Sequence, residues 1–322
     1  MDNPADEIQS TRHTQELSPT SKQSTFDTED VIFRDEFHCV MHEFTTKMFR
    51  KTSRHSQYIN VPNSPPRVLK RSFNHERITN EVNAVKLVSE HTTIPVSRLL
   101  DHGINPDGTR YLVAELITGV PLTNVLGAGC LQVFGQKHDD STKELCTTCE
   151  RTAYSIAVKF IEEIVLPQLS NMKKSHERGI DGFVMPPVWL SMDRISPWKE
   201  KECRLSTRPL DTPEYVFMHG DLAEHNILID VRAFEVCALV DWEYAGYFPV
   251  GMDRWPGVLD RFVYDHVADD LAWLIEDYLA EDYLEACDQL EDREELHLLV
   301  KSGRVPSPER LRESIAMKVS QK

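Results

Sequence analysis

Two short apolar runs enclose a polar loop in the second half of the chain, and this pattern is the clearest structural signal in the sequence. Residues 215–218 (YVFM) and 226–229 (NILI) are rich in β-branched and aromatic side chains, which favour strands. The intervening residues, including 221–225, are mostly polar and predict a loop held at both ends. Residues 236–240 (VCALV) are continuously apolar, which is typical of a buried strand.

Polar side chains at the ends of these strands are candidates for chemistry. Asp221 lies in the loop, Asn226 follows five positions later, and Asp241 comes directly after the buried run. Carboxylate and amide oxygens are ligands for hard cations, and a loop anchored by two strands can direct both groups to one point. A capping or surface role is the simpler interpretation of any single aspartate. The three residues together favour phosphoryl transfer, which requires a base and metal ligands.

The segments HGDLAEHN (219–226) and LVDWEYAG (239–246) resemble the catalytic and metal-binding segments of the aminoglycoside phosphotransferase family, which is related to choline and ethanolamine kinases. The resemblance implies an α+β, protein-kinase-like two-lobed fold with a small β-rich N-terminal lobe and a larger, mainly helical C-terminal lobe. It implies ATP and Mg²⁺ as cofactors. It also makes Asp221 the catalytic base, Asn226 and Asp241 the magnesium ligands, and His219 a support for the loop.

A kinase of this type also holds the nucleotide phosphates with a lysine, which a glutamate orients. Residues 66–70 (PRVLK) predict a short strand that ends in Lys70, and residues 76–91 follow a helical pattern with one apolar stripe. Glu81 lies beside this stripe, so the matching positions are Lys70 and Glu81. A solvated Lys70, with Arg71 in its place, is the alternative.

Residues 110–119 (RYLVAELITG) predict a strand that ends at a glycine-marked break. This segment resembles the hinge between the two lobes of the family, where backbone groups bind the adenine ring. By position, the candidate acceptor is the carbonyl of Ala114 or Glu115, and the candidate donor is the amide of Leu116 or Ile117.

The segment expected to cover the phosphates departs from the usual pattern. Residues 53–66 (SRHSQYINVPNSPP) contain no glycine, although backbone amides approach phosphates most easily where side chains are absent. This departure keeps open the alternative of a catalytically weak pseudokinase or nucleotide-binding scaffold. Protein kinase activity is less favoured, because no Ala-Pro-Glu type segment follows Asp241.

Charge adds information about partners. The chain has 36 Lys and Arg against 52 Asp and Glu, a net charge of −16, which disfavours nucleic acid and anionic membranes. Acidic residues gather in 265–295, where Arg293 is the single lysine or arginine. A solvated helix surface explains most of them. The resemblance places part of the acceptor site in C-terminal helices, so one or two of Asp265, Asp269 and Asp270 are candidates for binding a cationic acceptor.

Cysteine usage and hydropathy indicate the compartment. The seven cysteines are scattered, which argues against a disulfide scaffold and for a reducing environment. Cys146 and Cys149 form half of a zinc motif, but no second pair stands at zinc spacing, so coincidence is the favoured interpretation. No apolar stretch is long enough to span a membrane. We therefore expect a cytoplasmic protein.

The 322 residues divide into three parts in this interpretation. Residues 1–30 are polar and predict a disordered tail. Residues 31–116 would form the nucleotide-binding small lobe, with a helix over residues 30–51, and residues 117–322 the catalytic and acceptor-binding large lobe. The sequence thus predicts an ATP- and magnesium-dependent kinase acting on a hydroxyl of a small molecule. ATP or GTP, the acceptor and the oligomeric state stay open.

Overall fold

The structure is a computed structural model of the chain. It describes residues 26, 30–37, 39–59, 65–69, 71–132, 137–142, 144–187, 190, 197–198, 205–206, 211–252, 255–260 and 271–320. The predicted tail, apart from Phe26 and Asp30, lies outside these residues.

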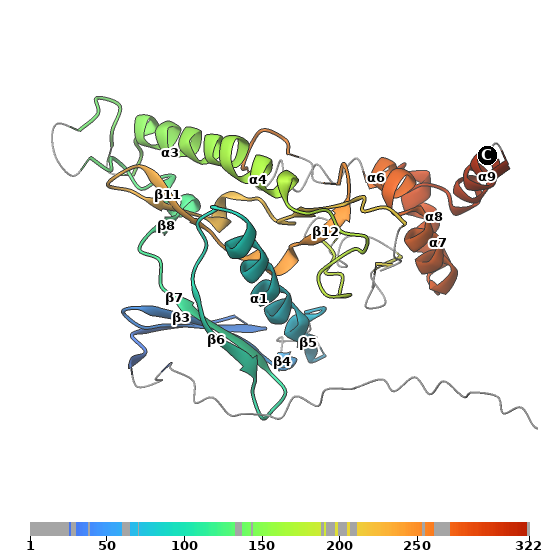
Figure 1. Ribbon diagram of the computed structural model, residues 1–322, viewed down its shortest axis with the longest axis horizontal. Coiled ribbons are helices and arrows are strands. Elements are labelled where there is room, and N and C mark those ends of the chain that lie inside the picture. The colour runs from blue at the N-terminus through green and yellow to red at the C-terminus, as the bar shows by residue number, and fades with distance from the viewer. Residues whose placement is uncertain are drawn as a thin grey trace, which may run out of the picture.

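The N-terminal part of the chain forms a five-stranded antiparallel sheet in the order β1-β2-β3-β7-β6 (Figure 1). Its strands are β1 (Phe33–Glu36), β2 (Val40–Phe44), β3 (Met48–Ser53), β6 (Leu99–Ile104) and β7 (Arg110–Glu115). A separate ribbon pairs β4 (Gln57–Ile59) with β5 (Arg67–Leu69).

The helix predicted over residues 30–51 is wrong, because this segment forms β1, β2 and most of β3. A turn divides it at Thr45, whose hydroxyl oxygen accepts hydrogen bonds from the amides of Lys47 (3.2 Å) and Met48 (2.9 Å). Such local bonds to a threonine hydroxyl favour turns over helix. The two halves then pair as antiparallel strands, with Val40 opposite Ser53.

One long helix, α1 (Asn74–His91), packs against the sheet, as the helical pattern of residues 76–91 predicts. Ile78 and Val82 on the helix form a small core with Leu112 and Ala114 of β7. The helix also contacts a 3₁₀ turn, η5 (Trp242–Tyr244), in the C-terminal part of the chain. Helix α1 is therefore a direct connection between the sheet and the segment after Asp241.

The C-terminal part carries two small antiparallel sheets that position the predicted catalytic loop. Strands β8 (Val120–Pro121), β10 (Ile227–Asp230) and β11 (Glu235–Leu239) form one sheet, and β9 (Tyr215–Met218) and β12 (Gly246–Pro249) form the other. The three strands predicted over residues 215–240 are thus confirmed. The loop between β9 and β10 includes the 3₁₀ turn η4 (Glu224–Asn226).

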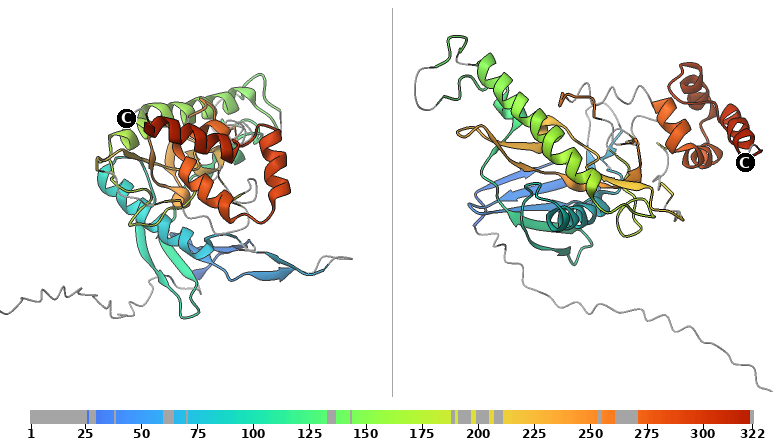
Figure 2. Two further views of the ribbon diagram at one scale, coloured as in Figure 1. Left: turned by 90° about the vertical axis from the view of Figure 1, so that its right-hand side faces the viewer. Right: turned by 45° about the horizontal axis from the view of Figure 1, so that its top comes forward.

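Helices surround these strands and enclose the main core. They are α2 (Leu122–Val125), α3 (Thr147–Phe160), the π-helical turn η2 (Ile161–Val165), α4 (Leu166–Asn171), α6 (Leu271–Tyr278), α7 (Ala280–Gln289), α8 (Arg293–Lys301) and α9 (Pro308–Ser320). Helices α3 and α4 lie along one side of the strands, and α6 to α9 gather at one end of the molecule (Figures 1 and 2). Among the described residues, no helix is both long and apolar enough to cross a membrane.

A β-rich N-terminal part thus stands beside a larger, mainly helical C-terminal part (Figure 2). The expected α+β fold, with a small β-rich N-terminal part and a larger, mainly helical C-terminal part, is thus confirmed.

Candidate active site

The loop between β9 and β10 is held in place by a buried histidine. His219 lies between two backbone groups: its Nδ1 accepts a hydrogen bond from the amide of Asp221 (3.2 Å), and its Nε2 lies 3.1 Å from the carbonyl oxygen of Val240. Burial lowers the pKa of His219, which favours the neutral ring with the proton on Nε2. The histidine therefore ties the loop to the end of β11.

Gly220 allows this loop to pass close to its neighbour. Its φ is +81°, and a Cβ atom built there would lie 2.3 Å from the carbonyl oxygen of Tyr244. Only glycine fits such a conformation and approach without strain. The loop bearing Asp221 and the turn after Asp241 are thus in backbone contact.

Asp221 and Asn226 are brought together as predicted from their spacing. The side-chain nitrogen of Asn226, Nδ2, donates to the backbone oxygen of Asp221 (2.9 Å) and to Asp221 Oδ2 (3.2 Å). Both side chains are buried, and His225 Nε2 lies 3.4 Å from Asp221 Oδ2. Because the Asn226 nitrogen is engaged, its amide oxygen is the atom left to bind a cation.

Asp241 directly follows β11 and adopts a left-handed backbone conformation, with φ of +61°. Asparagine and aspartate tolerate this region better than most residues, and such conformations gather at functional sites. The side chain is about one-third exposed (32 %), unlike the buried Asp221. Asp241 is therefore the accessible carboxylate of the site.

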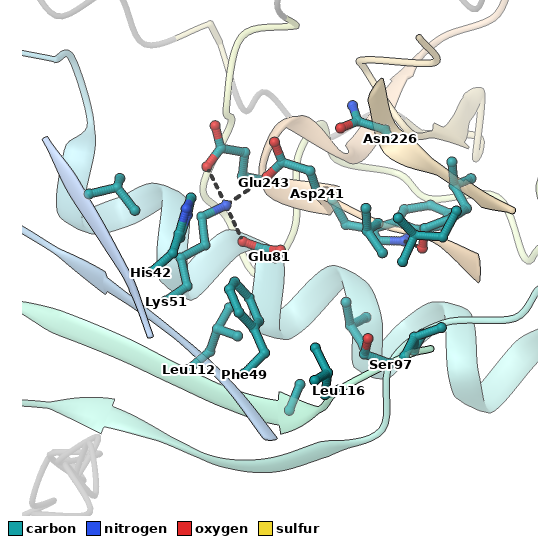
Figure 3. A pocket seen from close by; sticks show the side chains of 18 of the residues that line it. His42, Phe49, Lys51, Glu81, Ser97, Leu112, Leu116, Asn226, Asp241 and Glu243 are labelled. Atoms are coloured by element: carbon teal, nitrogen blue, oxygen red, sulfur yellow. Dashed lines mark hydrogen bonds and ion pairs between the residues drawn. The ribbon is translucent and has the colours of Figure 1, made fainter. Parts of the chain in front are cut away.

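Lys51 on β3 contacts three carboxylates (Figure 3). Its Nζ donates to Asp241 Oδ1 (2.6 Å), Glu81 Oε2 (2.8 Å) and Glu243 Oε2 (2.9 Å), which uses the three donors of an ammonium group. Burial acts to lower the pKa of Lys51, but the carboxylates, led by Asp241, raise it well above its usual value. Lys51 is thus a permanently charged group at the meeting point of the two lobes.

Lys51 is not among the candidates that the sequence singles out, where Lys70 is the predicted partner of Glu81. Lys70 lies outside the described residues, and the described partner of Glu81 is Lys51. The signal that could have revealed Lys51 is the threonine-containing turn ahead of it, which marks a hairpin. The predicted helix over residues 30–51 concealed that signal.

Glu243 joins this cluster to further basic groups. Its Oε1 accepts from Arg77 (2.5 Å) and Arg71 (2.7 Å). Burial acts to raise the pKa of Glu243, but Lys51, Arg77 and Arg71 together hold it far below its usual value. The carboxylate is therefore ionised and fully paired, as a buried charge requires.

Asn80 on α1 fixes the backbone beside this carboxylate. Its side-chain nitrogen, Nδ2, donates to the backbone carbonyl oxygens of Glu243 (3.0 Å) and Ala245 (2.8 Å). The polar contacts of α1 thus hold the segment after Asp241 in a single position.

A cavity of about 740 Å³ opens beside the lysine cluster. Its polar end includes Lys51, Asn226 and Asp241, whereas most of its walls are apolar (Figure 3). The size is that of a typical small-molecule or cofactor site. The apolar walls include residues from both lobes, namely Val40, Leu99, Leu112, Ala114, Leu228 and Leu239.

The predicted hinge borders the same cavity, which is lined by all four candidate residues from Ala114 to Ile117. The backbone amide of Leu116 donates to the carbonyl oxygen of Lys47 (2.8 Å), and the backbone amide of Glu115 donates to the carbonyl oxygen of Arg98 (3.0 Å). The Leu116 amide is thus engaged within the sheet edge. The alternative donor from the sequence analysis, the amide of Ile117, is the better candidate.

The turn between β1 and β2 also reaches the cavity. Phe37 and Cys39 from this turn line it, and residues 33–44 contain no glycine. The glycine-free segment 53–66, in contrast, contains strand β4 of the β4–β5 ribbon. The departure from a glycine-rich cover therefore holds for the segment that actually lines the cavity.

The three acidic candidates for acceptor binding, Asp265, Asp269 and Asp270, all lie outside the described residues. Glu224, in the loop between β9 and β10, has its pKa raised by burial and by the nearby Asp260. Glu224 and Asp260 are thus two described carboxylates close to each other at the candidate catalytic loop.

Residues 190–299 match the model of a phosphotransferase enzyme family. This segment contains Asp221, Asn226 and Asp241, so the match supports a phosphotransferase. No curated protein matches the chain in sequence.

Solved structures with a similar arrangement have low identity. A type VIII aminoglycoside-3'-phosphotransferase is 16 % identical, with 67 % of this chain and 71 % of that chain covered and a TM-score of 0.38. A ternary complex of the aminoglycoside phosphotransferase APH(4)-Ia with AMP-PNP and hygromycin B is 11 % identical, with coverage of 80 % and 78 % and a TM-score of 0.38. The similarity to a phosphotransferase family therefore rests on residues 190–299, the segment that carries the candidate catalytic loop.

Proposed function

We propose that this protein is an ATP- and magnesium-dependent phosphotransferase that phosphorylates a hydroxyl group of a small molecule. The observation that carries the proposal is the convergence of Lys51, Glu81 and Asp241 at the polar end of the 740 Å³ cavity. Asp221 and Asn226 lie on the adjoining loop. This is the set of groups that phosphoryl transfer requires: a base, cation ligands and a phosphate-binding lysine.

Each residue has a distinct role in this proposal. Asp221 accepts the proton of the acceptor hydroxyl through a carboxylate oxygen while the hydroxyl oxygen attacks the terminal phosphorus of ATP. The bond between this phosphorus and the bridging oxygen breaks, and ADP leaves. Lys51 binds the nucleotide phosphates, and Glu81 holds the lysine in place. The adenine ring would lie between the apolar walls, with its edge toward the backbone of Ala114 to Ile117.

The carboxylate of Asp241 and the amide oxygen of Asn226 fit a magnesium ion, which prefers oxygen ligands. Asp241 is accessible enough to bind one, and the Asn226 nitrogen is turned toward Asp221. A bound magnesium ion would neutralise charge on the transferred phosphate. Asp241 would then exchange part of its contact with Lys51 for the ion.

The acceptor is proposed to be a small molecule. The negative charges near the catalytic loop indicate its chemical class. Glu224 and Asp260 near the catalytic loop, together with a net charge of −16, favour a cationic acceptor such as an amino alcohol or an aminoglycoside. The reducing compartment implied by the cysteines fits a cytoplasmic enzyme.

A second candidate function is a pseudokinase or nucleotide-binding scaffold of the same fold. The observation that favours it is the turn between β1 and β2, where Phe37 and Cys39 replace the glycines that normally cover phosphates.

The two functions differ in turnover. The purified chain is incubated with Mg²⁺ and either ATP or GTP, together with a panel of neutral and cationic alcohols, and nucleoside diphosphate release is recorded. The phosphotransferase predicts acceptor-dependent release that disappears when Mg²⁺ is chelated. Nucleotide binding without release for any acceptor would favour the scaffold.

A further inference from the structure

A second cluster of reactive side chains lies in the loop between α2 and α3 and in the first turn of α3, outside the proposed active site. Cys130, His138, Cys146 and Cys149 each direct one ligand atom inward, and these four atoms lie within 4.8 Å of one another. Figure 1 shows this loop beyond the N-terminal end of α3, at the opposite end of the molecule from α6 to α9. The cluster is therefore separate from helices α6 to α9.

The distances within the cluster fit a single tetrahedral ion. The Nδ1 atom of His138 lies 3.3 Å from Cys146 Sγ, 3.5 Å from Cys149 Sγ and 3.7 Å from Cys130 Sγ. Zinc binds sulfur at ~2.3 Å and imidazole nitrogen at ~2.0 Å, so a tetrahedral site places these atoms about 3.5 Å apart. The three distances lie around this value.

The backbone around the cluster is arranged to support a metal. Cys146 directly precedes α3 and Cys149 lies in its first turn, where the helix dipole favours negative charge on a thiolate. The amide of Leu131 donates to Cys149 Sγ (3.4 Å), a contact that would orient and stabilise a metal-bound thiolate. Both Cys146 and Cys149 are buried.

Asp140 fixes the segment between the histidine and the first of the paired cysteines. Its Oδ2 accepts from the amide of Thr148 (3.0 Å), and the loop closes with a hydrogen bond from the amide of Thr142 to the carbonyl of Leu145 (2.6 Å). The segment thus returns His138 toward the start of α3.

We propose that Cys130, His138, Cys146 and Cys149 bind one zinc ion in a closed structural site. Three thiolates and one imidazole form a Cys₃His ligand set, which favours zinc over magnesium or calcium. Binding replaces the thiol protons of the three cysteines, which are released to solvent, while His138 binds through unprotonated Nδ1. Because the protein supplies all four ligands, no position is left for a substrate.

This proposal revises the interpretation of the sequence. On spacing alone, Cys146 and Cys149 resemble half a zinc motif, and coincidence is the favoured interpretation because no second pair stands at zinc spacing. The other two ligands instead come from a C-x₇-H-x₇-C-x₂-C arrangement that contains a single CxxC pair. Folding of the loop supplies what a search for paired spacings missed.

The site would stabilise the connection that follows the hinge. Pro121, directly before α2, lines the nucleotide cavity, and α2 packs against α3. A zinc ion in the next loop would anchor that loop to the start of α3. Its proposed role is structural and does not depend on the proposed kinase activity.

The first test measures metal in the full-length chain purified under reducing conditions without added metal. Elemental mass spectrometry should find about one zinc ion per chain. Removal of that zinc with a strong chelator should lower the unfolding temperature, and Zn²⁺ alone should restore it. Zinc content below about one-tenth per chain, with no gain in unfolding temperature on adding Zn²⁺, would overturn the proposal.

The second test adds Co²⁺ alone to the protein after a chelator has removed its zinc. The spectrum of the parent chain is the main readout, so the test does not depend on the folding of a variant. A tetrahedral thiolate site should give visible ligand-field bands and near-ultraviolet charge-transfer absorption. Cys130→Ser should change the spectrum, whereas the matched variant Cys237→Ser, outside the cluster, should leave it intact. An octahedral Co²⁺ spectrum in the parent chain, or a Cys146–Cys149 disulfide found by mass spectrometry under reducing purification, would contradict a zinc site.

Discussion

Lys51 and Asp241 lie 190 residues apart in the chain, yet Lys51 Nζ donates a 2.6 Å hydrogen bond to Asp241 Oδ1. The pair joins β3 of the small lobe to the end of β11 in the large lobe. Asp241 thus serves two functions in the proposed mechanism, since it contacts the phosphate-binding lysine and would also bind magnesium. This double role makes the carboxylate a sensitive target for mutation.

Replacing Asp241 with alanine should remove the magnesium-dependent part of nucleotide binding. Saturating ATP with Mg²⁺, at about 100 times its dissociation constant, should stabilise the parent protein by ~2.7 kcal/mol and raise its unfolding temperature by several degrees. In Asp241→Ala the added effect of Mg²⁺ should vanish in a thermal-shift assay. Asp277→Ala, an exposed position on α6, is the control. An undiminished magnesium effect in Asp241→Ala would exclude Asp241 as a ligand.

Replacing Lys51 with methionine should destabilise the fold as well as nucleotide binding. The change leaves Glu81 and Glu243 buried without their shared ammonium group, and removal of one partner of a buried ion pair typically costs about 3 to 5 kcal/mol. The exposed Lys47 in the preceding turn offers a matched control, for which Lys47→Met should change stability by less than about 0.5 kcal/mol. Urea unfolding of both variants measures the difference, and equal losses would refute the central position of Lys51.

Glu81 should make the stability of the protein depend on pH. Burial raises the pKa of Glu81 to about 7 from an ordinary value of 4.5, although Lys51 opposes the rise. The folded state therefore retains a proton that the unfolded state releases between these values. The stabilisation from this group is complete below the unfolded pKa and is lost as the pH rises through about 7.

Glu81→Gln cannot titrate, so it isolates this effect. The free energy of unfolding of the parent protein minus that of Glu81→Gln should fall as the pH rises from 5 to about 8, measured by urea unfolding at each pH. A difference that stays constant or increases with pH would show that the pKa of Glu81 is not raised in the folded state.

Two glycines with similar backbone angles separate the effect of strain from that of contact. Gly220 and Gly108 have φ of +81° and +86°, but an added Cβ would clash with the Tyr244 carbonyl oxygen only at Gly220, since nothing lies within 4 Å at Gly108. In both variants, alanine in the left-handed conformation should lower the free energy of unfolding by about 1 kcal/mol. Gly220→Ala should lose at least ~2 kcal/mol more and should also lower turnover, because the loop bearing Asp221 must move. Similar losses in both variants would contradict this close approach.

Site residues whose positions depend on neighbours in the chain could be predicted from the sequence. Those whose positions depend on the pairing of distant strands could not. Asp221, Asn226 and Asp241 stand at the ends of short apolar strands, so their neighbours in the chain determine where they lie. Lys51 depends on the pairing of β3 with β2 and β7, and no pattern within a few residues of it fixes that pairing. The helical periodicity of residues 30–51 was only partial, and turn chemistry at Thr45 outweighed it.

The same distinction applies to the cysteine cluster. The Cys146 and Cys149 pair was visible because its two-residue spacing is a local signal. Cys130 and His138 became partners only through the folding of the loop before α3. An expectation based on paired spacings would therefore overlook the proposed ligand set, which contains one pair and two single residues.

The most direct test of the central claim follows the γ-phosphoryl group itself. ATP labelled at its γ-phosphate is incubated with Mg²⁺ and the acceptor panel, and the labelled acceptor is identified by mass spectrometry for the parent protein and for Asp221→Ala. The proposed function predicts a phosphorylated alcohol, with turnover reduced by roughly 10² to 10⁴ in Asp221→Ala, or about 3 to 5 kcal/mol of barrier, and ATP binding retained. Labelled product formed equally well by Asp221→Ala, or no transfer to any acceptor despite ATP binding, would contradict it.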